Sequence, residues 1–235
     1  MTIFVKEKEL IVPGQILAEG NNYKVGNGVR KDGPYYRSVV FGIFTGSGNT
    51  ISARALRGKY LPRVGDVVIG MVIDVGLTMW RLDIGSPYEG ILFANNATTR
   101  KFDPVKHDAR QIYDVGDVVR AKIIAFDRTK DPSLTTLERG LGKLTGGKII
   151  SVTPTKISRV IGHKGSMINI IKKYTKTNIL IGQNGRIWIE GKSMEDEMKA
   201  IEAIKLVEKE ALRQGLTDRI EQFLKSYDEV KNRNE

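Results

Sequence analysis

The residues best suited to bind a ligand lie between positions 146 and 189. This stretch holds eight lysines or arginines and no aspartate or glutamate. Near its centre, Gly162 and Gly165 stand three residues apart in the string VIGHKGSMI, residues 160–168. Two glycines at this spacing let the backbone turn tightly, and the helix expected after them favours an anion at its N-terminus. The pattern predicts a loop that holds a nucleic-acid strand by its phosphates.

Few other residues in the sequence could do chemistry. The chain has two histidines and no cysteine, which excludes disulfides, thiolate metal sites and cysteine nucleophiles. A Walker-type loop, a Gly-x-Ser-x-Gly motif and a paired-histidine metal motif are likewise missing from the sequence. His163 could act as a general acid or base, but its stretch offers no carboxylate to orient it. We therefore favour a simple contact from the loop.

Carboxylates leave two further alternatives open. His107 lies near Asp103 and Asp108 and could ligate a metal ion, although such a trio in a polar loop is far more often an ordinary surface. Asp127 and Asp131 could serve a carboxylate-only, metal-dependent nuclease. We favour neither alternative, and we predict no catalytic residue, no metal and no cofactor.

The charge balance indicates the kind of partner. The formal net charge is +11 and the sequence pI is about 9.7, which favours an acidic partner, nucleic acid before membrane. Basic residues outnumber acidic ones by ten to four in residues 1–64 and by seventeen to twelve in residues 146–235, but the two are equal in residues 65–145. The sequence has no apolar core of signal-peptide length and no apolar run that could span a membrane. We expect a soluble, cytoplasmic protein without a membrane partner.

Short β-branched or alternating runs fill the first segment, residues 1–62. Turn signals such as Pro13-Gly14 separate these runs, as is typical of a small antiparallel β domain. Residues 42–48 could be mistaken for a phosphate loop, but they lack its Gly-Lys-Ser/Thr ending, so we favour a hairpin turn. A basic and aromatic group here could dock on a partner, or it could be a solvated sheet face with ordinary core aromatics. Its members are Tyr35, Tyr36, Arg54, Arg57 and Tyr60.

The middle segment, residues 63–139, has the pattern of an OB-type barrel with one long insert. The string VGDVV occurs at residues 64–68 and again at residues 115–119, and each copy leads into a strand. The sequence between the copies does not match itself, so two strands of one barrel with similar lead-in turns fit better than a duplication. Strands are expected at residues 67–75, 80–84, 90–93, 118–126 and near 134–137.

A set of residues across this segment carries a family resemblance: Gly65-Asp66, Gly70, Val72, Leu82-Asp83-Ile84, Glu89-Gly90, Val115-Gly116-Asp117, Asp127-Arg128 and Leu134-Thr135. With them the segment resembles an S1-type RNA-binding domain. Alternation along the second strand places Trp80 toward the core and Arg81 outward, where this family usually has an aromatic residue. Phe93 stands where the family often has a histidine. We therefore expect phosphate contacts rather than base stacking, although some of these charges could be merely solvated. The candidates are Arg81, Arg120, Lys122 and Arg128.

The last segment, residues 146–235, follows four glycines at residues 140–147 that we expect to form a flexible joint. Strands are expected at residues 148–152, 178–181 and 186–190, and helices at residues 157–160, at residues 166–173 and after Ser193. This order, with its Gly-x-x-Gly loop, resembles a KH domain over about residues 148–212. The resemblance implies that the loop lines the phosphates of RNA and that nearby cations attract it. The loop residues are Gly162, His163, Lys164 and Gly165, and the cations are Arg159, Lys172 and Lys173.

Two helices are expected at the end of the chain. Ser193 and Asp196 signal the start of the first, and Asp218 and Glu221 signal the start of the second. The first should bury Met194, Met198, Ile201 and Ile204. The second carries an apolar stripe that we expect to pack on its own chain rather than on a partner: Ile220, Phe223, Leu224 and Tyr227. The turn at residues 182–185 (GQNG) could contact RNA or close a hairpin, and we favour the hairpin.

Strings along the whole chain support a third resemblance: Val12-Pro13-Gly14, RGKYLP at residues 57–62, GQNG at residues 182–185 and GLTDR at residues 215–219. With its multidomain, mainly β plus α/β order of small β domain, S1-type barrel and KH domain, the chain resembles the RNA-binding cap subunit of the archaeal exosome. The resemblance implies a non-catalytic subunit, present in three copies on a hexameric ring of phosphorolytic ribonuclease subunits. The N-terminal domain would anchor to the ring, and single-stranded RNA would be captured and directed to the pore for 3′→5′ degradation. A stand-alone S1/KH translation or RNA-chaperone factor is the alternative.

Overall fold

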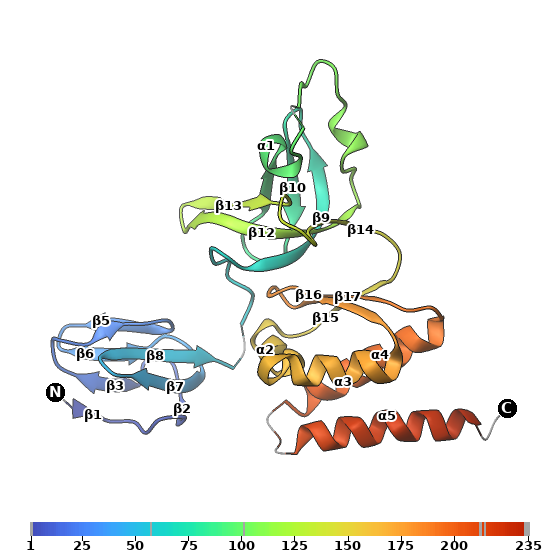
Figure 1. Cartoon of the computed structure of the whole chain (residues 1–235). Helices are drawn as coiled ribbons and strands as arrows, with labels where there is room; N and C mark the ends of the chain where they lie inside the picture. Colours follow the sequence, from blue (N-terminus) through green and yellow to red (C-terminus); the bar gives the residue numbers. More distant parts are fainter. Residues whose placement is uncertain (1, 57, 101, 212, 214, 233–235) are drawn as a thin grey trace. The chain divides into compact units, whose positions relative to one another are not determined.

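The computed structural model describes residues 2–56, 58–100, 102–211, 213 and 215–232. The chain divides into two compact units, Met1–Gly58 and Lys59–Glu235 (Figure 1). Strands build the first unit, whereas the second joins a β-barrel to a sheet covered by helices. No described helix is long and apolar enough to cross a membrane. The multidomain, mainly β plus α/β class predicted from the sequence is confirmed.

The first unit consists of two four-stranded sheets, with strand orders β1-β3-β6-β5 and β2-β7-β8-β4. Its strands are β1 (Thr2–Ile3), β2 (Leu10–Ile11), β3 (Ile16–Glu19), β4 (Lys24–Val25), β5 (Val29–Asp32), β6 (Tyr35–Ser38), β7 (Gly42–Ser47) and β8 (Thr50–Ala55). Both sheets contribute to one core, in which Ile11, Leu17 and Ile51 have no exposed surface. β4 and β8 run parallel, unlike the antiparallel pairs expected. The three strands between them along the chain supply the long connection that a parallel pair needs.

Residues 42–48 form a hairpin with the strand that follows, as predicted. β7 and β8 pair antiparallel, and Gly48 in the turn has a φ of +56°. A Cβ atom at Gly42 would lie 2.2 Å from the carbonyl oxygen of Arg54, so glycine at this position lets the two strands close. These glycines therefore serve strand pairing rather than phosphate binding.

A closed barrel of five strands opens the second unit. Its strands are β9 (Val67–Val75), β10 (Met79–Asp83), β11 (Gly90–Phe93), β12 (Val118–Asp127) and β13 (Lys130–Thr135), and its insert holds α1 (Ala94–Ala97) and the 3-10 helix η1 (Ala109–Gln111). β12 closes the barrel because its first half pairs with β9 and its second half with β13. Trp80, Leu82 and Ile84 have no exposed surface, which confirms the inward side of β10 predicted from alternation.

The two VGDVV strings form matching lead-in turns, as predicted. Gly65 and Gly116 have φ values of +93° and +90°, which favour glycine. The Gly65 N–H donates to the carbonyl of Ile123 on β12, and the Gly116 N–H donates to the carbonyl of Val72 on β9, both at 2.8 Å. Each turn therefore binds the strand that the other turn begins, which fixes the register of β9 and β12.

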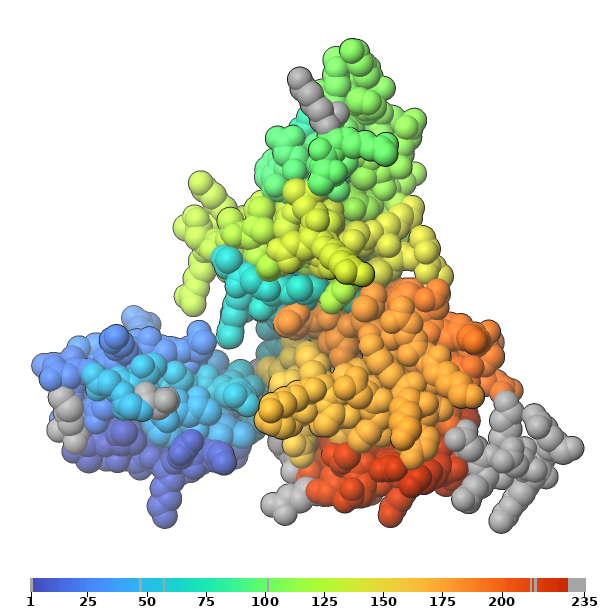
Figure 2. All heavy atoms as spheres, in the orientation of Figure 1, coloured from blue at the N-terminus to red at the C-terminus, as the bar shows by residue number. Residues whose placement is uncertain are grey.

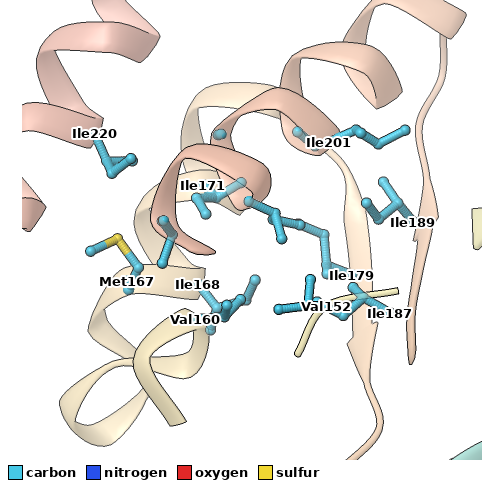
Figure 3. Packing of buried hydrophobic residues seen from close by; sticks show 14 of the residues in the cluster. Val152, Val160, Met167, Ile168, Ile171, Ile179, Ile187, Ile189, Ile201 and Ile220 are labelled. Carbon is cyan, nitrogen blue, oxygen red and sulfur yellow. The ribbon is translucent and has the colours of Figure 1, made fainter. Parts of the chain in front are cut away.

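The C-terminal domain is a three-stranded antiparallel sheet with helices, in the strand order β15-β17-β16. Its elements are β15 (Lys148–Ser151), η2 (Pro154–Lys156), α2 (Ile157–Ile161), η3 (His163–Gly165), α3 (Ser166–Thr175), β16 (Asn178–Ile181), β17 (Arg186–Glu190), α4 (Met194–Lys209) and α5 (Leu216–Asn232). Figure 3 shows the core between sheet and helices, in which Ile189 of β17, Ile171 of α3 and Ile201 of α4 belong to one buried cluster. Ile220 and Leu224 of α5 are fully buried in the same core, so the last helix packs on its own chain as predicted.

The prediction that Met194 and Met198 lie in the core was wrong. Their side chains are 70% and 39% exposed. The buried stripe of α4 is centred on Ala200, Ile204 and Val207. Successive residues of a helix are about 100° apart, so Met198 lies on the opposite side of the helix from Ala200. The prediction from the spacing of the methionines therefore assigned the wrong face of α4 to the core.

The predicted capping box of the last helix was also wrong. α5 begins at Leu216, so Asp218 lies within the first turn, where its charge still favours the helix N-terminus. Glu221 does not cap the helix but accepts a hydrogen bond from the hydroxyl of Tyr174 on α3 at 2.7 Å. The cap signal at Ser193 is confirmed, because its hydroxyl accepts the Asp196 N–H at 3.2 Å.

The segment of four glycines at residues 140–147, expected to form a flexible joint, includes a short strand, and its glycines take left-handed backbone conformations. β14 (Gly142–Leu144) lies antiparallel to β12 at the edge of the barrel sheet. The four glycines of this segment have φ values between +67° and +121°, so each takes a conformation that other residues disfavour. The indole N–H of Trp188 donates to the carbonyl of Gly146 at 2.9 Å. Backbone pairing and this bond connect the segment to the barrel and to the KH sheet.

The turn at residues 182–185 connects the C-terminal domain to the barrel. It closes the β16–β17 hairpin, as predicted, and its Asn184 is only 4% exposed. The Asn184 amide nitrogen donates to the carbonyls of Ile69 and Ile84 at 2.8 and 2.9 Å, and its oxygen accepts the Ile69 N–H at 3.2 Å. In Figure 2 the barrel surface, green to yellow, meets the C-terminal domain, orange to red.

Two contacts beside Asn184 strengthen this junction. The Gln183 N–H donates to the carbonyl of Val67 at 2.8 Å, and the Gln183 side chain accepts the Val67 N–H at 3.1 Å. Arg186 forms an ion pair with Asp83 of β10 and donates to the Asp83 carbonyl at 2.6 Å. Burial raises the pKa of Asp83, but the Gly85 amide and the Arg186 guanidinium outweigh burial and hold this pKa below its usual range.

Candidate nucleic-acid interface

The loop at residues 162–165 joins α2 to α3 through a defined, glycine-dependent turn. Gly162 has a φ of +76°, and a Cβ atom there would lie 2.6 Å from the backbone nitrogen of Met167. Glycine alone fits that position without displacing the backbone. Lys164 and Gly165 adopt left-handed angles, with φ values of +50° and +82°. The side chains of His163 and Lys164 are exposed at this turn.

The same turn leads directly into the N-terminus of α3. Gly165 precedes the helix and offers no side-chain cap, and the first turn contains no acidic residue. No side chain caps this ten-residue helix, and the N–H of its first residue, Ser166, donates to the His163 carbonyl. The helix dipole adds partial positive charge at this end. Loop and helix together can bind an anionic group through the backbone.

The predicted cations of this domain lie on α2, on the loop and on α3. Lys164 and Lys173 are exposed. Arg159 is exposed too, but its guanidinium donates to the carbonyl of Arg213 at 3.0 Å, which holds it against the segment between α4 and α5. Lys172 is half-buried, and burial together with the charge of Arg120 lowers its pKa.

On the barrel, β10 and β11 present a mixed outer face. Arg81 points outward, as predicted, and its Nε donates to Glu89 at 2.7 Å. Two residues along the strand, Met79 stands opposite Phe93, and these side chains are 38% and 44% exposed. An exposed aromatic side chain of this kind can stack on a base. Met79 and Phe93 were not predicted from the sequence as binding residues. The signal that could have found them is the position of Phe93, where the S1-type family often has a histidine.

The four candidate cations of the barrel do not share one strand. Arg81 lies on β10, whereas the others lie on β12 and the turn after it. Lys122 pairs with Glu138 at 2.6 Å, and Arg120 donates to the carbonyl of Gly140 at 2.8 Å. Arg128 is exposed in the turn between β12 and β13. The structure therefore places these residues on two strands and in one turn.

Two parts of the chain match known domain families. Residues 59–125 match the family described as RRP4, S1 domain, and residues 147–194 match the family described as KH domain. The chain is 45% identical over 228 residues to the exosome complex component Rrp4 of Thermococcus kodakarensis, across 95% of this chain and 88% of the relative. Its identity to the protein of the same name from Pyrococcus furiosus is 46%, across 95% and 85% of the two chains. The chain belongs to the exosome complex component Rrp4 family.

A solved structure extends the Rrp4 family likeness to three dimensions. It is the crystal structure of a candidate exosome complex RNA-binding protein, 39% identical to this chain. The match covers 74% of this chain and 99% of the other, with a TM-score of 0.69. The S1-type and KH resemblances predicted from the residues are thereby confirmed.

The first unit of this Rrp4 family member places the predicted docking residues differently from expectation. Tyr36 has no exposed surface, and its hydroxyl donates to the carbonyl of Tyr23 at 2.8 Å. Tyr60 belongs to the second unit, where it is 6% exposed and donates to Asp66 at 2.6 Å. Both tyrosines are core residues, so neither side chain can belong to a docking surface.

The remaining members of that predicted group are accessible or undescribed. Tyr35 is half-buried beside Arg37, whose guanidinium carbon lies 5.9 Å from the centre of the ring. Arg54 is exposed on β8. Arg57 lies outside the described residues.

An apolar patch beside Arg54 was not predicted. It consists of Leu10, Val12 and Phe41, which are 56%, 50% and 42% exposed. Leu10 stands opposite Ile43, and Ile43 stands opposite Arg54, so β2, β7 and β8 carry these side chains across one face. Val12 and Phe41 directly adjoin the paired residues Ile11 and Gly42. The β-strand alternation of Leu10, Ile11 and Val12 was the signal that could have found it.

The carboxylates considered for metal or catalytic roles have local partners. Asp127 accepts hydrogen bonds from the amide and hydroxyl of Thr129, and these bonds lower its pKa. The Asp131 carboxylate accepts a hydrogen bond from the Glu89 N–H at 3.2 Å. The imidazole Nδ1 of His107 accepts a hydrogen bond from the Asp103 N–H at 3.1 Å. Within the described residues, no group of three or more histidine and acidic side chains could hold a metal ion.

Proposed function

We propose that this chain is a non-catalytic, RNA-binding cap subunit of a cytoplasmic exosome. Its KH loop and barrel would capture single-stranded RNA and direct the RNA toward the pore of a hexameric ring of phosphorolytic ribonuclease subunits, with three copies around that pore. Weak sites on several copies raise the effective concentration of RNA at the pore without any single tight site. Membership of the Rrp4 family supports this proposal.

The observation that carries the proposal is the geometry of the loop at residues 162–165. A glycine that tolerates no Cβ atom brings the backbone close to a partner, and the uncapped N-terminus of α3 adds its positive end. The stretch around this loop lacks carboxylates that would repel phosphate. Backbone recognition of this type reads the sugar–phosphate chain and not the base sequence, so we expect little sequence preference.

The first unit would attach the subunit to the rest of the complex. Its exposed apolar patch of Leu10, Val12 and Phe41 offers surface that gains free energy when it is covered. Arg54 on the same face can pair with a carboxylate of the partner. We expect Leu10→Ser combined with Phe41→Ser to abolish co-elution with the ring proteins while RNA binding by the isolated chain stays unchanged.

The RNA-binding site is tested with Lys164→Asp. Aspartate tolerates the left-handed backbone of this position, so the loop should keep its shape while its charge reverses. Lys205→Asp, on the exposed side of α4, makes the same change of charge elsewhere in the domain and is the matched control. Binding of a fluorescent oligoribonucleotide should weaken about tenfold or more in Lys164→Asp at low salt. Equal affinity in the two variants would refute the loop as the site of capture.

The alternatives are separated by two further measurements. Formation of product after incubation of the purified chain with labelled RNA and Mg²⁺ or Mn²⁺ would favour a metal-dependent nuclease and overturn the non-catalytic role. Elution of the chain apart from the ring proteins, with RNA binding intact, would favour a stand-alone S1/KH factor.

A further inference from the structure

Three arginines gather where α2 meets the segment between α4 and α5. Arg213 and Arg219 both donate to the same oxygen of Glu210, Oε1, at 3.5 and 3.1 Å. Because the two bonds share one acceptor atom, the two guanidinium groups lie side by side. The guanidinium of Arg159 on α2 donates to the backbone carbonyl of Arg213 at 3.0 Å, which brings it to the same segment. These three residues form an arginine cluster.

The carboxylate that holds this cluster lies beneath it. The Glu210 side chain is 11% exposed, whereas the Arg213 and Arg219 side chains are 64% and 47% exposed. The second oxygen of Glu210, Oε2, is buried. One arginine would neutralise one carboxylate, but this carboxylate has two, and Arg159 adds a third cation beside them. The surface that a ligand meets is therefore positive.

The cluster has hydrogen-bond donors that can serve a ligand. A guanidinium carries five N–H donors in a planar fork that fits the oxygens of phosphate. Among the hydrogen bonds of the described residues, each of the three guanidinium groups donates from a single nitrogen. Arg213 and Arg219 can therefore each offer two parallel N–H groups to a phosphate without leaving Glu210.

The cluster adjoins the loop at residues 162–165. Arg159 lies on α2, and Gly162 follows it three residues later, about 4.5 Å along the helix at 1.5 Å per residue. α2 contacts both α4 and η3, so it connects the cluster to the loop. Figure 1 shows α2 and the start of α5 at the same end of the KH domain. The other two arginines lie beyond the stretch that matches the KH family, so that likeness assigns them no role.

We propose that the arginine cluster binds phosphodiester groups next to those held at the 162–165 loop, as a second contact with the same RNA strand. This inference rests on the proposed function and extends its RNA site beyond the KH match. The carboxylates of a protein partner could also meet an arginine cluster, but the position of this one beside the loop favours RNA. Because the contact is to phosphate, it adds affinity without sequence preference.

The test compares variants of the full chain. Arg213→Gln and Arg219→Gln each remove one guanidinium, and Arg219→Lys keeps the charge. Lys205→Gln removes an exposed cation of α4 and is the control for net charge. Binding of a fluorescent single-stranded oligoadenylate is measured by anisotropy across a series of salt concentrations. Loss of one phosphate contact with a single strand reduces the slope of log K against log salt by about 0.7.

We expect Arg213→Gln and Arg219→Gln each to reduce that slope by about 0.7, which corresponds to about fivefold weaker binding at 0.1 M salt. Arg219→Lys and Lys205→Gln should keep the slope of wild type. A slope that is unchanged in both glutamine variants of the cluster, or lost equally in Arg219→Lys, would overturn the proposal while leaving RNA binding at the loop intact. No binding of RNA by the wild-type chain at low salt would instead overturn the proposed function.

Two further readouts separate RNA contact from the other roles that such a cluster could have. The thermal unfolding midpoint of Arg219→Gln should equal that of Arg219→Lys, because Arg213 still pairs with Glu210 in both. A clear fall in Arg219→Gln alone would assign this arginine to neutralisation of Glu210 and overturn the proposal. Co-elution with the ring proteins should be unchanged in every variant. If it is lost while RNA affinity is kept, the cluster binds an acidic protein surface and the assignment to RNA is wrong.

Discussion

Asn184→Ala should uncouple the barrel from the KH domain. The side chain of Asn184 is 4% exposed and makes three hydrogen bonds to β9 and to the residue that follows β10. Each is worth about 1 kcal/mol net, and the backbone groups of Ile69 and Ile84 would lose their partners inside the junction, where water cannot readily replace them. We therefore expect the free energy of unfolding of the second unit to fall by about 3–5 kcal/mol.

Denaturant unfolding followed by tryptophan fluorescence measures this change, because Trp80 lies in the barrel core and Trp188 in the KH sheet. If the junction couples the domains, the variant should show two transitions or a lower slope in place of one cooperative step. Gln183→Ala is the matched control, since Gln183 is exposed and its side chain accepts one hydrogen bond at 3.1 Å. A loss of less than about 1 kcal/mol in Asn184→Ala, equal to that of the control, would refute the reasoning.

Three other outcomes are expected. Gly147→Ala should lower the free energy of unfolding by about 2 kcal/mol or more in a denaturant titration, because φ is +67° and a Cβ atom would lie 2.4 Å from the Ile189 carbonyl. Phe93→Ala should weaken oligoribonucleotide binding about tenfold and leave its salt slope unchanged, because base stacking releases no counterions. The folded state lowers the pKa of Asp83, so the stability that its ionised form supplies through Arg186 is present above about pH 4 and is lost as pH falls through the lowered pKa. The melting temperatures of wild type and Asp83→Asn should therefore converge as pH falls below about 4. A difference that stays constant as the pH is lowered would contradict this.

Local patterns predicted the elements well where backbone geometry and side-chain period act alone. The strands at residues 67–75, 90–93 and 178–181 have the bounds expected. Alternation on β10 correctly separated Trp80 from Arg81, because successive side chains of a strand point to opposite faces whatever lies around them.

Predictions that needed the phase of a helix or the identity of a neighbour were less successful. Met198 fits an apolar spacing with Ile201, yet the buried face of α4 is set by the sheet and helices against which it packs. Tyr36 is of a residue type that is common at docking surfaces, but its ring is buried in the core of the first unit. Residue type does not reveal which of two faces will be covered, because that depends on distant parts of the chain.

The sequence by itself determined the charge, the missing catalytic motifs, the Gly-x-x-Gly turn and the order of the domains, because each depends on residue type and short-range spacing. Only the tertiary structure decided that Asn184 joins the barrel to the KH domain. The bond between Asn184 and Ile69 links residues 115 positions apart in the chain. Whether a buried amide or a partly desolvated cation stabilises the fold depends on the group that lies opposite it. That partner is brought into place only by folding.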